Sequence, residues 1–262
     1  SYVGSRGVNL GRLPNFNIAD WTLLPDGRKF WPAGAERRNP TFASMDSRVY
    51  DTNSLYSSLQ LQLKKRFSEG LQFQGSYTWA HAIDMAIGQE AFSGGWDAFS
   101  MDPFDPSLDR GRSSWDIRHN FALNFSYDLP FGRNQTGAAG KILGGWQTSG
   151  ILNLHTGPPF TALVRFNNSR NLNTPAIPIP VERPNLKAGA DNNPVLGGPD
   201  RYVDSSPFEV ADVGTLGDLG RNTIDKPGHA TFDFSLLKNT SVNEQINVQF
   251  RAEFFNMFNH AN

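Results

Sequence analysis

Two kinds of side chain alternate in the stretch Ile246-Asn247-Val248-Gln249-Phe250-Arg251-Ala252-Glu253-Phe254-Phe255-Asn256-Met257-Phe258-Asn259. From position 246 to 254 every even residue is apolar, and from 247 to 253 every odd residue is polar or charged. Because successive side chains of a strand point to opposite faces, the stretch predicts a strand with one apolar and one polar face. This pattern suits a boundary between oil and water and is typical of transmembrane barrel strands.

Alternation of the same kind occurs earlier in the chain. It predicts strands over Leu55–Phe67, Leu71–Trp79, His119–Leu129, Trp146–Thr156 and Thr231–Leu237. Ser68-Glu69-Gly70 separates the first two, and a short linker that ends in Gly predicts a hairpin. The fold class that we expect is all-β, an antiparallel up-and-down transmembrane β-barrel portion of about six long strands with long extracellular loops.

The connections between these strands alternate in length. They divide the chain into a loop (1–53), a hairpin (54–81), a long loop (82–118), a strand pair (119–156), a very long loop (157–229) and a final hairpin (230–258). In residues 1–53 we expect at most one or two short strands, because Pro and Gly interrupt every possible element. Transmembrane barrels have tight turns on the periplasmic side and long loops outside, so the long connections are predicted to be extracellular.

Composition excludes several classes of protein. The net charge of -1 gives no general attraction to nucleic acid, and without cysteine there is no disulfide framework or thiolate chemistry. No apolar run approaches the roughly 20 residues of a transmembrane helix. The chain opens with Ser1-Tyr2-Val3-Gly4 and no signal peptide, so we expect either a mature protein or a piece of a longer chain.

The alternation assigns side chains to two environments. The predicted lipid-facing residues are Leu59, Leu61, Leu63, Phe121, Leu123, Phe125, Ile246, Val248, Phe250 and Phe254. The predicted lumen-facing residues are Gln60, Gln62, Asn124, Asn247, Gln249, Arg251 and Glu253, of which Arg251 and Glu253 share a side and could pair.

Several motifs resemble one family when they are read in order. They are SSLQLQL (57–63) with KRF (65–67), GSYTW (75–79), DRG (109–111), WDIRHNF (115–121), YDLPFG (127–132), GGWQ (144–147), GI (150–151), TGPPF (156–160) and RAEFFNMFNHAN (251–262). This set, which covers roughly residues 40–262, is similar to TonB-dependent receptors, above all to the Oar-like group with an N-terminal carboxypeptidase-regulatory-like domain.

The resemblance implies a ligand-gated transporter of the bacterial outer membrane. Such a receptor has a 22-stranded barrel plugged by a separate N-terminal domain, and it takes up a scarce large nutrient with energy delivered by TonB. This chain lacks the plug, the TonB box and the strand that should follow Asn262. We therefore expect a C-terminal portion of the barrel, in contact with outer-membrane lipid and coupled to TonB only through a plug domain absent from this chain.

Residues that carry enzyme or metal chemistry are scattered. The five histidines form no H-E-x-x-H motif, no G-x-S-x-G elbow occurs, and we expect no enzyme, no cofactor and no metal centre. One sharper hypothesis concerns Asp102, Asp105 and Asp109, whose carboxylates in a Pro-rich loop could bind Ca²⁺. A series of Asx-Pro turns at a loop surface explains the same residues and is favoured.

Loop aromatics are the candidates for ligand contact. Trp96, Phe99 and Phe104 could stack on a sugar or another flat ligand, and so could Trp21 and Trp31 of the first loop. Packing within the folded loops is the simpler account. Residues 64–66 (Lys-Lys-Arg) could form a lipid-phosphate patch, and a strand end with side chains that snorkel explains them equally well.

A second function class fits the alternation too. A soluble or surface-layer β-sandwich adhesin or binding module would pack its apolar faces against each other and make contacts through its long loops. Strand length favours the barrel. Leu55–Phe67 would span about 43 Å at roughly 3.3 Å per residue, which is long for a sandwich.

Overall fold

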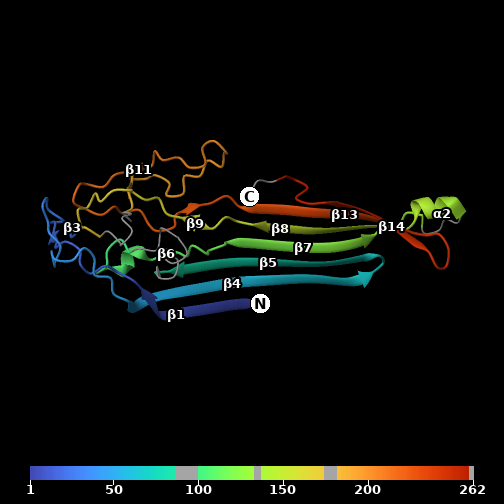
Figure 1. The fold of residues 1–262 in the computed structure, drawn as a ribbon, viewed down its shortest axis with the longest axis horizontal. Helices are drawn as coiled ribbons and strands as arrows, with labels where there is room; N and C mark the ends of the chain where they lie inside the picture. The colour runs from blue at the N-terminus through green and yellow to red at the C-terminus, as the bar shows by residue number, and fades with distance from the viewer. Residues whose placement is uncertain (86–99, 133–136, 174–181, 260–262) are drawn as a thin grey trace.

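A single sheet of long antiparallel strands forms the body of the protein (Figure 1). The computed structural model describes residues 1–85, 100–132, 137–173 and 182–259. The long strands are β1 (Tyr2–Arg12), β4 (Val49–Ser68), β5 (Leu71–Asp84), β7 (His119–Asp128), β8 (Trp146–His155), β13 (His229–Ser241) and β14 (Asn247–Phe254). They lie in the order β1-β4-β5-β7-β8-β13-β14, so each long strand pairs with the next one along the chain.

The remaining elements are short. They are β2 (Thr22–Leu23), β3 (Lys29–Phe30), the 3-10 helix η2 (Pro106–Asp109), β6 (Gly111–Arg112), α2 (Gly137–Leu143), β9 (Pro159–Phe160), β10 (Asn185–Leu186), β11 (Phe208–Glu209) and β12 (Ile224–Asp225). Apart from β6, which extends the main sheet beside β5, these strands form two-stranded ladders within the connections. No described helix combines the length and the apolar character needed to cross a bilayer.

The hairpin of β4 and β5 shows how the local sequence sets the register. Ser68 pairs with Leu71, which leaves Glu69 and Gly70 as the two turn residues. Both have positive φ, 54° and 84°, as a type I′ turn requires. This turn continues the right-handed twist of the strands, and the hairpin predicted from the sequence is confirmed.

Each of the six predicted strands is present, but residues 1–53 were assigned wrongly. The 11 residues of β1 form a full strand against β4, and β4 itself begins at Val49. The error has a physical reason. Gly4, Gly7 and Gly11 dilute the alternation of β1, and the register shifts near Leu10, so the period of two is broken.

The connection between β7 and β8 contains a helix that the Gly-rich sequence did not predict. The seven-residue helix α2 begins at Gly137, which has a φ of 66°. Lys238 of β13 donates hydrogen bonds from its ammonium to the carbonyl oxygens of Lys141, at 2.7 Å, and Gly144. A cation at these carbonyls stabilises the C-terminal end of a helix.

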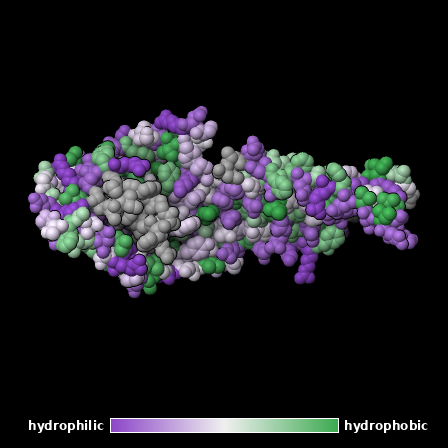
Figure 2. All heavy atoms as spheres, viewed as in Figure 1, coloured by the Kyte–Doolittle hydropathy of each residue, from purple (hydrophilic) through white to green (hydrophobic). Residues whose placement is uncertain are grey.

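Short and long connections lie at opposite ends of the sheet, as Figure 1 shows. The turn between β4 and β5, the α2 connection and the turn between β13 and β14 are at one end. Figure 2 shows the hydrophobic patch of α2 at this end, where Ile142 is 67% exposed. The connections from β1 to β4, from β5 to β7 and from β8 to β13 are all at the other end.

The long connections fold together into what we call the loop body, the described parts of residues 13–48, 100–118 and 156–228. Its hydrophobic core contains Ile18, Ala19 and Trp31, which are all fully buried. The Trp31 indole donates a hydrogen bond to the Ala19 carbonyl oxygen at 2.9 Å, so the polar end of this ring is satisfied as well.

The sheet has one layer and does not close into a barrel. Within the described residues no second sheet packs on its apolar face, where Leu61 and Leu63 are 53% and 66% exposed. The β-sandwich alternative is therefore wrong, because a sandwich buries this face against another sheet.

Candidate functional site

The register of the sheet sorts its side chains onto two faces. Residues that pair directly in an antiparallel sheet lie on the same face. Leu123 pairs with Gly75 and Leu152, whereas its neighbour Asn124 pairs with Gln74 and Ile151. Extended along all strands, this pairing places the predicted lipid-facing residues of the strands on one face and the predicted lumen-facing residues on the other. Their contact with lipid or lumen stays a prediction.

The apolar face has the height of a membrane. The ten residues of β7 span about 33 Å at roughly 3.3 Å per residue, and at a tilt of about 40° this length covers about 25 Å. The apolar band of outer-membrane barrels is also about 25 Å tall. The length of β7 therefore matches the height of such a band.

Aromatic and amphipathic side chains mark both borders of this face. Near the loop body, Trp79 pairs with Leu59 and His119 and is 52% exposed. Near the turns, Lys238 pairs with Trp146 and Phe250, and its ammonium lies 5.8 Å from the centre of the Trp146 ring. Rings and long cationic side chains at these heights form the girdles of membrane barrels.

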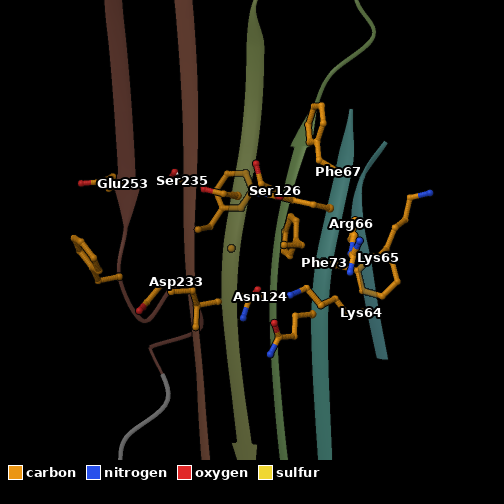
Figure 3. Close-up of a pocket in the computed structure, with 18 residues that line it drawn as sticks. Lys64, Lys65, Arg66, Phe67, Phe73, Asn124, Ser126, Asp233, Ser235 and Glu253 are labelled. Atoms are coloured by element: carbon orange, nitrogen blue, oxygen red, sulfur yellow. Dashed lines mark hydrogen bonds between the residues drawn. The ribbon is translucent and has the colours of Figure 1, made fainter. Parts of the chain in front are cut away.

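The polar face is hollowed into a trough of 620 Å³, drawn in Figure 3. One row of paired residues crosses it from strand to strand, namely Lys64, Gln74, Asn124, Ile151 and Asp233. In the row beside it, the hydroxyls of Ser149 and Ser235 lie 2.9 Å apart. Ile151 is the apolar residue in this row, and the alternation of β8 did not predict that an apolar side chain would lie on the polar face.

Charges in the trough separate by sign. Lys64 and Arg66 lie on β4, and Asp233 and Glu253 lie across the trough on β13 and β14 (Figure 3). Glu253 also accepts a hydrogen bond from Arg251 at 3.5 Å, which confirms that these two residues can pair. A ligand on this face would therefore contact hydrogen-bond donors of β4 on one side and carboxylates of β13 and β14 on the other.

A buried network holds the loop body to the ends of the strands. Arg183 and Asp109 form an ion pair at 3.0 Å and are both almost fully buried. Burial raises the pKa of the Asp109 carboxyl, although Arg183 and the Ser100 hydroxyl, which donates at 2.7 Å, act in the opposite direction. Arg221 donates to the Asp109 carbonyl oxygen at 2.7 Å and pairs with Asp84 at the end of β5.

Asp116 forms a second link between the loop body and the sheet. Its carboxylate is fully buried and accepts hydrogen bonds from Arg112 at 2.8 Å and from the backbone amide of Ala82 at 2.7 Å. Burial disfavours its charge, but these donors and Arg118 lower the pKa of Asp116 overall. Arg112 also pairs with Asp225 at 2.6 Å. The motif WDIRHNF contains Asp116, yet nothing in the sequence alone indicated this role.

The calcium hypothesis is wrong for the described residues. Asp102 pairs with Lys29, Asp105 accepts from the Ser107 amide at the start of η2, and Asp109 pairs with Arg183. No group of three His, Asp or Glu side chains in the described part of the chain can hold a metal ion. The carboxylates of Asp102 and Asp105 accept from the amides of Phe104 and Ser107, as the turn interpretation predicted, whereas Asp109 is buried and paired with Arg183, which it did not predict.

Of the three aromatics predicted to contact ligand, only Phe104 can be described. Trp96 and Phe99 lie outside the described residues. The Phe104 ring packs against Phe16 and Trp21, each with 5.3 Å between ring centres, and Arg38 lies 4.2 Å above it. Phe104 therefore belongs to a cluster at the surface of the loop body, and its part in ligand contact stays a prediction.

Long strands with one apolar and one polar face, turns at one end and a folded loop body at the other define part of a membrane-spanning barrel wall. The family model described as "Outer membrane beta barrel domain" matches residues 1–262, and the chain belongs to this family. The protein is therefore located in the bacterial outer membrane. No curated protein and no solved structure matches the chain.

Proposed function

We propose that the chain forms part of the barrel of a TonB-dependent receptor that takes up a scarce, large nutrient. The observation that carries this proposal is the loop body, in which residues 13–48 and 156–228 share a hydrophobic core and hydrogen bonds join residues 100–118 to residues 156–228. A passive pore needs no such body at its outer end. A receptor does, because it has to recognise a ligand before the ligand enters the barrel.

The polar trough supports the same proposal. Its amides, hydroxyls and separated charges give weak polar contacts along the predicted lumen wall, beside the end of the sheet that carries the turns. A path of many weak contacts lets a ligand leave as well as enter. We expect transport and not catalysis from this arrangement, with outer-membrane lipid on the apolar face and TonB acting through a plug domain.

Uptake by cells that produce the intact receptor tests the proposal. We expect accumulation of a labelled mixture of compounds too large for general porins, and we expect a protonophore or loss of TonB to abolish it. The variant Asp109→Asn, which weakens the loop body, should lower uptake while the amount of receptor in the outer membrane stays the same. Uptake that persists without TonB and with a protonophore would contradict energised transport.

A further inference from the structure

A cavity of 1110 Å³ lies where the outer ends of β7, β8 and β13 meet the loop body. Its roof includes residues 197–199 and Tyr202 of the long connection before β13. The Tyr202 hydroxyl donates to the Asp225 carbonyl oxygen at 2.9 Å, and the Leu196 amide donates to the Tyr202 carbonyl oxygen at 2.8 Å. Hydrogen bonds thus hold the roof in place over the strand ends.

The floor of this cavity belongs to the apolar face of the sheet. Phe121 pairs with Leu154, and Leu154 pairs with Ala230, so the three side chains share a face. Phe121 also pairs with Tyr77. The floor is therefore continuous with the surface that is predicted to face lipid.

The rim of the cavity is basic. Arg112, Arg118 and Lys226 line it, and Asp225 is the carboxylate among the lining residues. Asp225 is already engaged by Arg112 at 2.6 Å and by the Asn193 amide at 2.8 Å. Lys226 is exposed and forms no ion pair within the described residues, and the ionic contact of Arg118 with Asp116 is long, at 3.5 Å. Two cations thus remain available to an anion.

The height of the cavity indicates where such an anion would come from. His119, which lines it, pairs with Trp79 in the aromatic border near the loop body. Aromatic borders lie at the level of the lipid headgroups. An apolar floor on the membrane side and a basic rim at headgroup level together match an amphiphile with an acyl chain and a phosphorylated head.

We propose that this cavity binds a phosphorylated glycolipid of the outer leaflet, with an acyl chain along Phe121, Leu154 and Ala230 and a phosphate between Lys226 and Arg118. The inference uses the outer-membrane location and the assignment of the loop body to the cell exterior. It does not depend on TonB or on transport. A receptor that failed the uptake test would still be expected to hold this lipid.

Binding of diphosphoryl lipid A to the intact, detergent-purified protein tests the proposal. We expect the double variant Lys226→Gln/Arg118→Gln to bind this lipid at least about tenfold more weakly, because it loses two charge-assisted hydrogen bonds to phosphate. Lipid A stripped of both phosphates should bind the wild type and the variant equally. The single variant Lys226→Gln alters an exposed side chain that has no ion pair in the described part of the chain, so its loss of binding cannot be attributed to misfolding.

Arg165→Gln is the matched control, because Arg165 is an exposed loop cation that does not line the cavity. Its affinity for diphosphoryl lipid A should equal that of the wild type. Equal binding by the wild type and the Lys226→Gln/Arg118→Gln variant would overturn the proposal. Displacement of the lipid by millimolar inorganic phosphate would overturn it too, because the site would then recognise a free anion and not a lipid.

Discussion

Glu182 is a buried carboxylate that contacts hydrogen-bond donors but, within the described residues, forms no ion pair. Its oxygens accept from the amides of Asn168 and Ser169, at 2.9 and 3.0 Å, and from the Ser169 hydroxyl at 2.7 Å. Burial raises the pKa of Glu182 above its usual 4.5, although these donors act to lower it. The side chain thus links two segments of the loop body at an electrostatic cost.

The raised pKa predicts that Glu182 contributes most to the stability of the loop body in acid. Below pH 4.5 the carboxyl is protonated in folded and unfolded chains, and its charge is not buried. As the pH rises through the folded pKa, ionisation inside the loop body lowers the stability. Glu182→Gln should remove this dependence and at neutral pH stabilise residues 168–169 by roughly 1 kcal/mol, the scale of one hydrogen bond.

Amide exchange at residues 168 and 169, corrected for the intrinsic effect of pH, measures this prediction. The control is Glu209→Gln on β11, because Glu209 is exposed and its removal should leave the pH profile unchanged. A wild-type protection that stays flat from pH 4.5 to neutral pH would contradict the argument.

For Asp116 we predict the opposite effect, because the charge of its carboxylate stabilises the link between the loop body and the sheet. Asp116→Asn removes the charge that faces Arg112 and Arg118, and it should destabilise the link between loop body and sheet by about 2–3 kcal/mol. This is below the roughly 3–5 kcal/mol for breaking a buried pair, since Arg112 keeps Asp225.

Limited proteolysis of the loop body, with the protein in detergent, measures this effect as faster cleavage. Asp20→Asn is the matched control. Asp20 pairs with Arg38 at the surface and is 74% exposed, so its loss should cost less than about 1 kcal/mol. Equal cleavage rates for the two variants would refute the central place of Asp116.

At the scale of the strand, the two faces of β7 make a direct comparison possible. Leu123 and Asn124 are neighbours in sequence, and the register places them on opposite faces. Near the middle of the bilayer an Arg on the lipid face costs about 2–4 kcal/mol, whereas lumen substitutions cost little. Leu123→Arg should therefore destabilise the protein by about that amount, and Asn124→Arg should be nearly neutral.

Equilibrium unfolding of the intact protein in lipid vesicles measures the difference between these two variants. The same residue is introduced at adjacent positions, so its own propensity for the strand cancels. If Asn124→Arg were the more destabilising of the two, the assignment of the faces would be reversed.

Strands were predictable where alternation was clean and less so where glycine intervened. β14, β7 and the hairpin of β4 and β5 show a period of two, and the sequence located these strands, although β4 begins six residues before its predicted start and β5 ends five residues after its predicted end. β8 alternates weakly because Gly150 stands where an apolar side chain was expected. A Cβ there would lie 2.7 Å from the Phe125 ring and 2.9 Å from the Phe232 ring, so the neighbouring rings cover the space above the glycine.

The structure of the loop body could not be predicted from the sequence, because its contacts join residues that are far apart in the chain. Arg183 and Asp109 are separated by 74 positions, and Arg221 and Asp84 by 137. No local period indicates such pairs. Only the residue types were evident beforehand, as charged residues in Pro-rich connections, and surface turns explain such residues equally well. The calcium hypothesis failed for this reason, since two of the carboxylates that it assigned to a metal, Asp102 and Asp109, pair with Lys29 and Arg183.

At the scale of the whole molecule, ion pairs join the loop body to the ends of the strands. Asp84 at the end of β5 pairs with Arg221, and Arg112 beside it pairs with Asp116 and Asp225. A ligand that displaced the loop body would therefore act directly on the ends of β5 and β7. In a receptor this is the connection through which occupancy outside can reach the wall of the barrel.

The placement of the two ends across the membrane is testable because the chain contains no cysteine. Leu23, on β2 of the loop body, is 68% exposed, and Val242, in the turn between β13 and β14, is 51% exposed. In intact cells a membrane-impermeant maleimide should label Leu23→Cys and not Val242→Cys, and both should react once the outer membrane is permeabilised. The two sites are similarly exposed, so a difference in their labelling would be caused by the bilayer and not by burial. Labelling of Val242→Cys alone in intact cells would invert the protein in the membrane and move the loop body, with its proposed lipid site, to the periplasm.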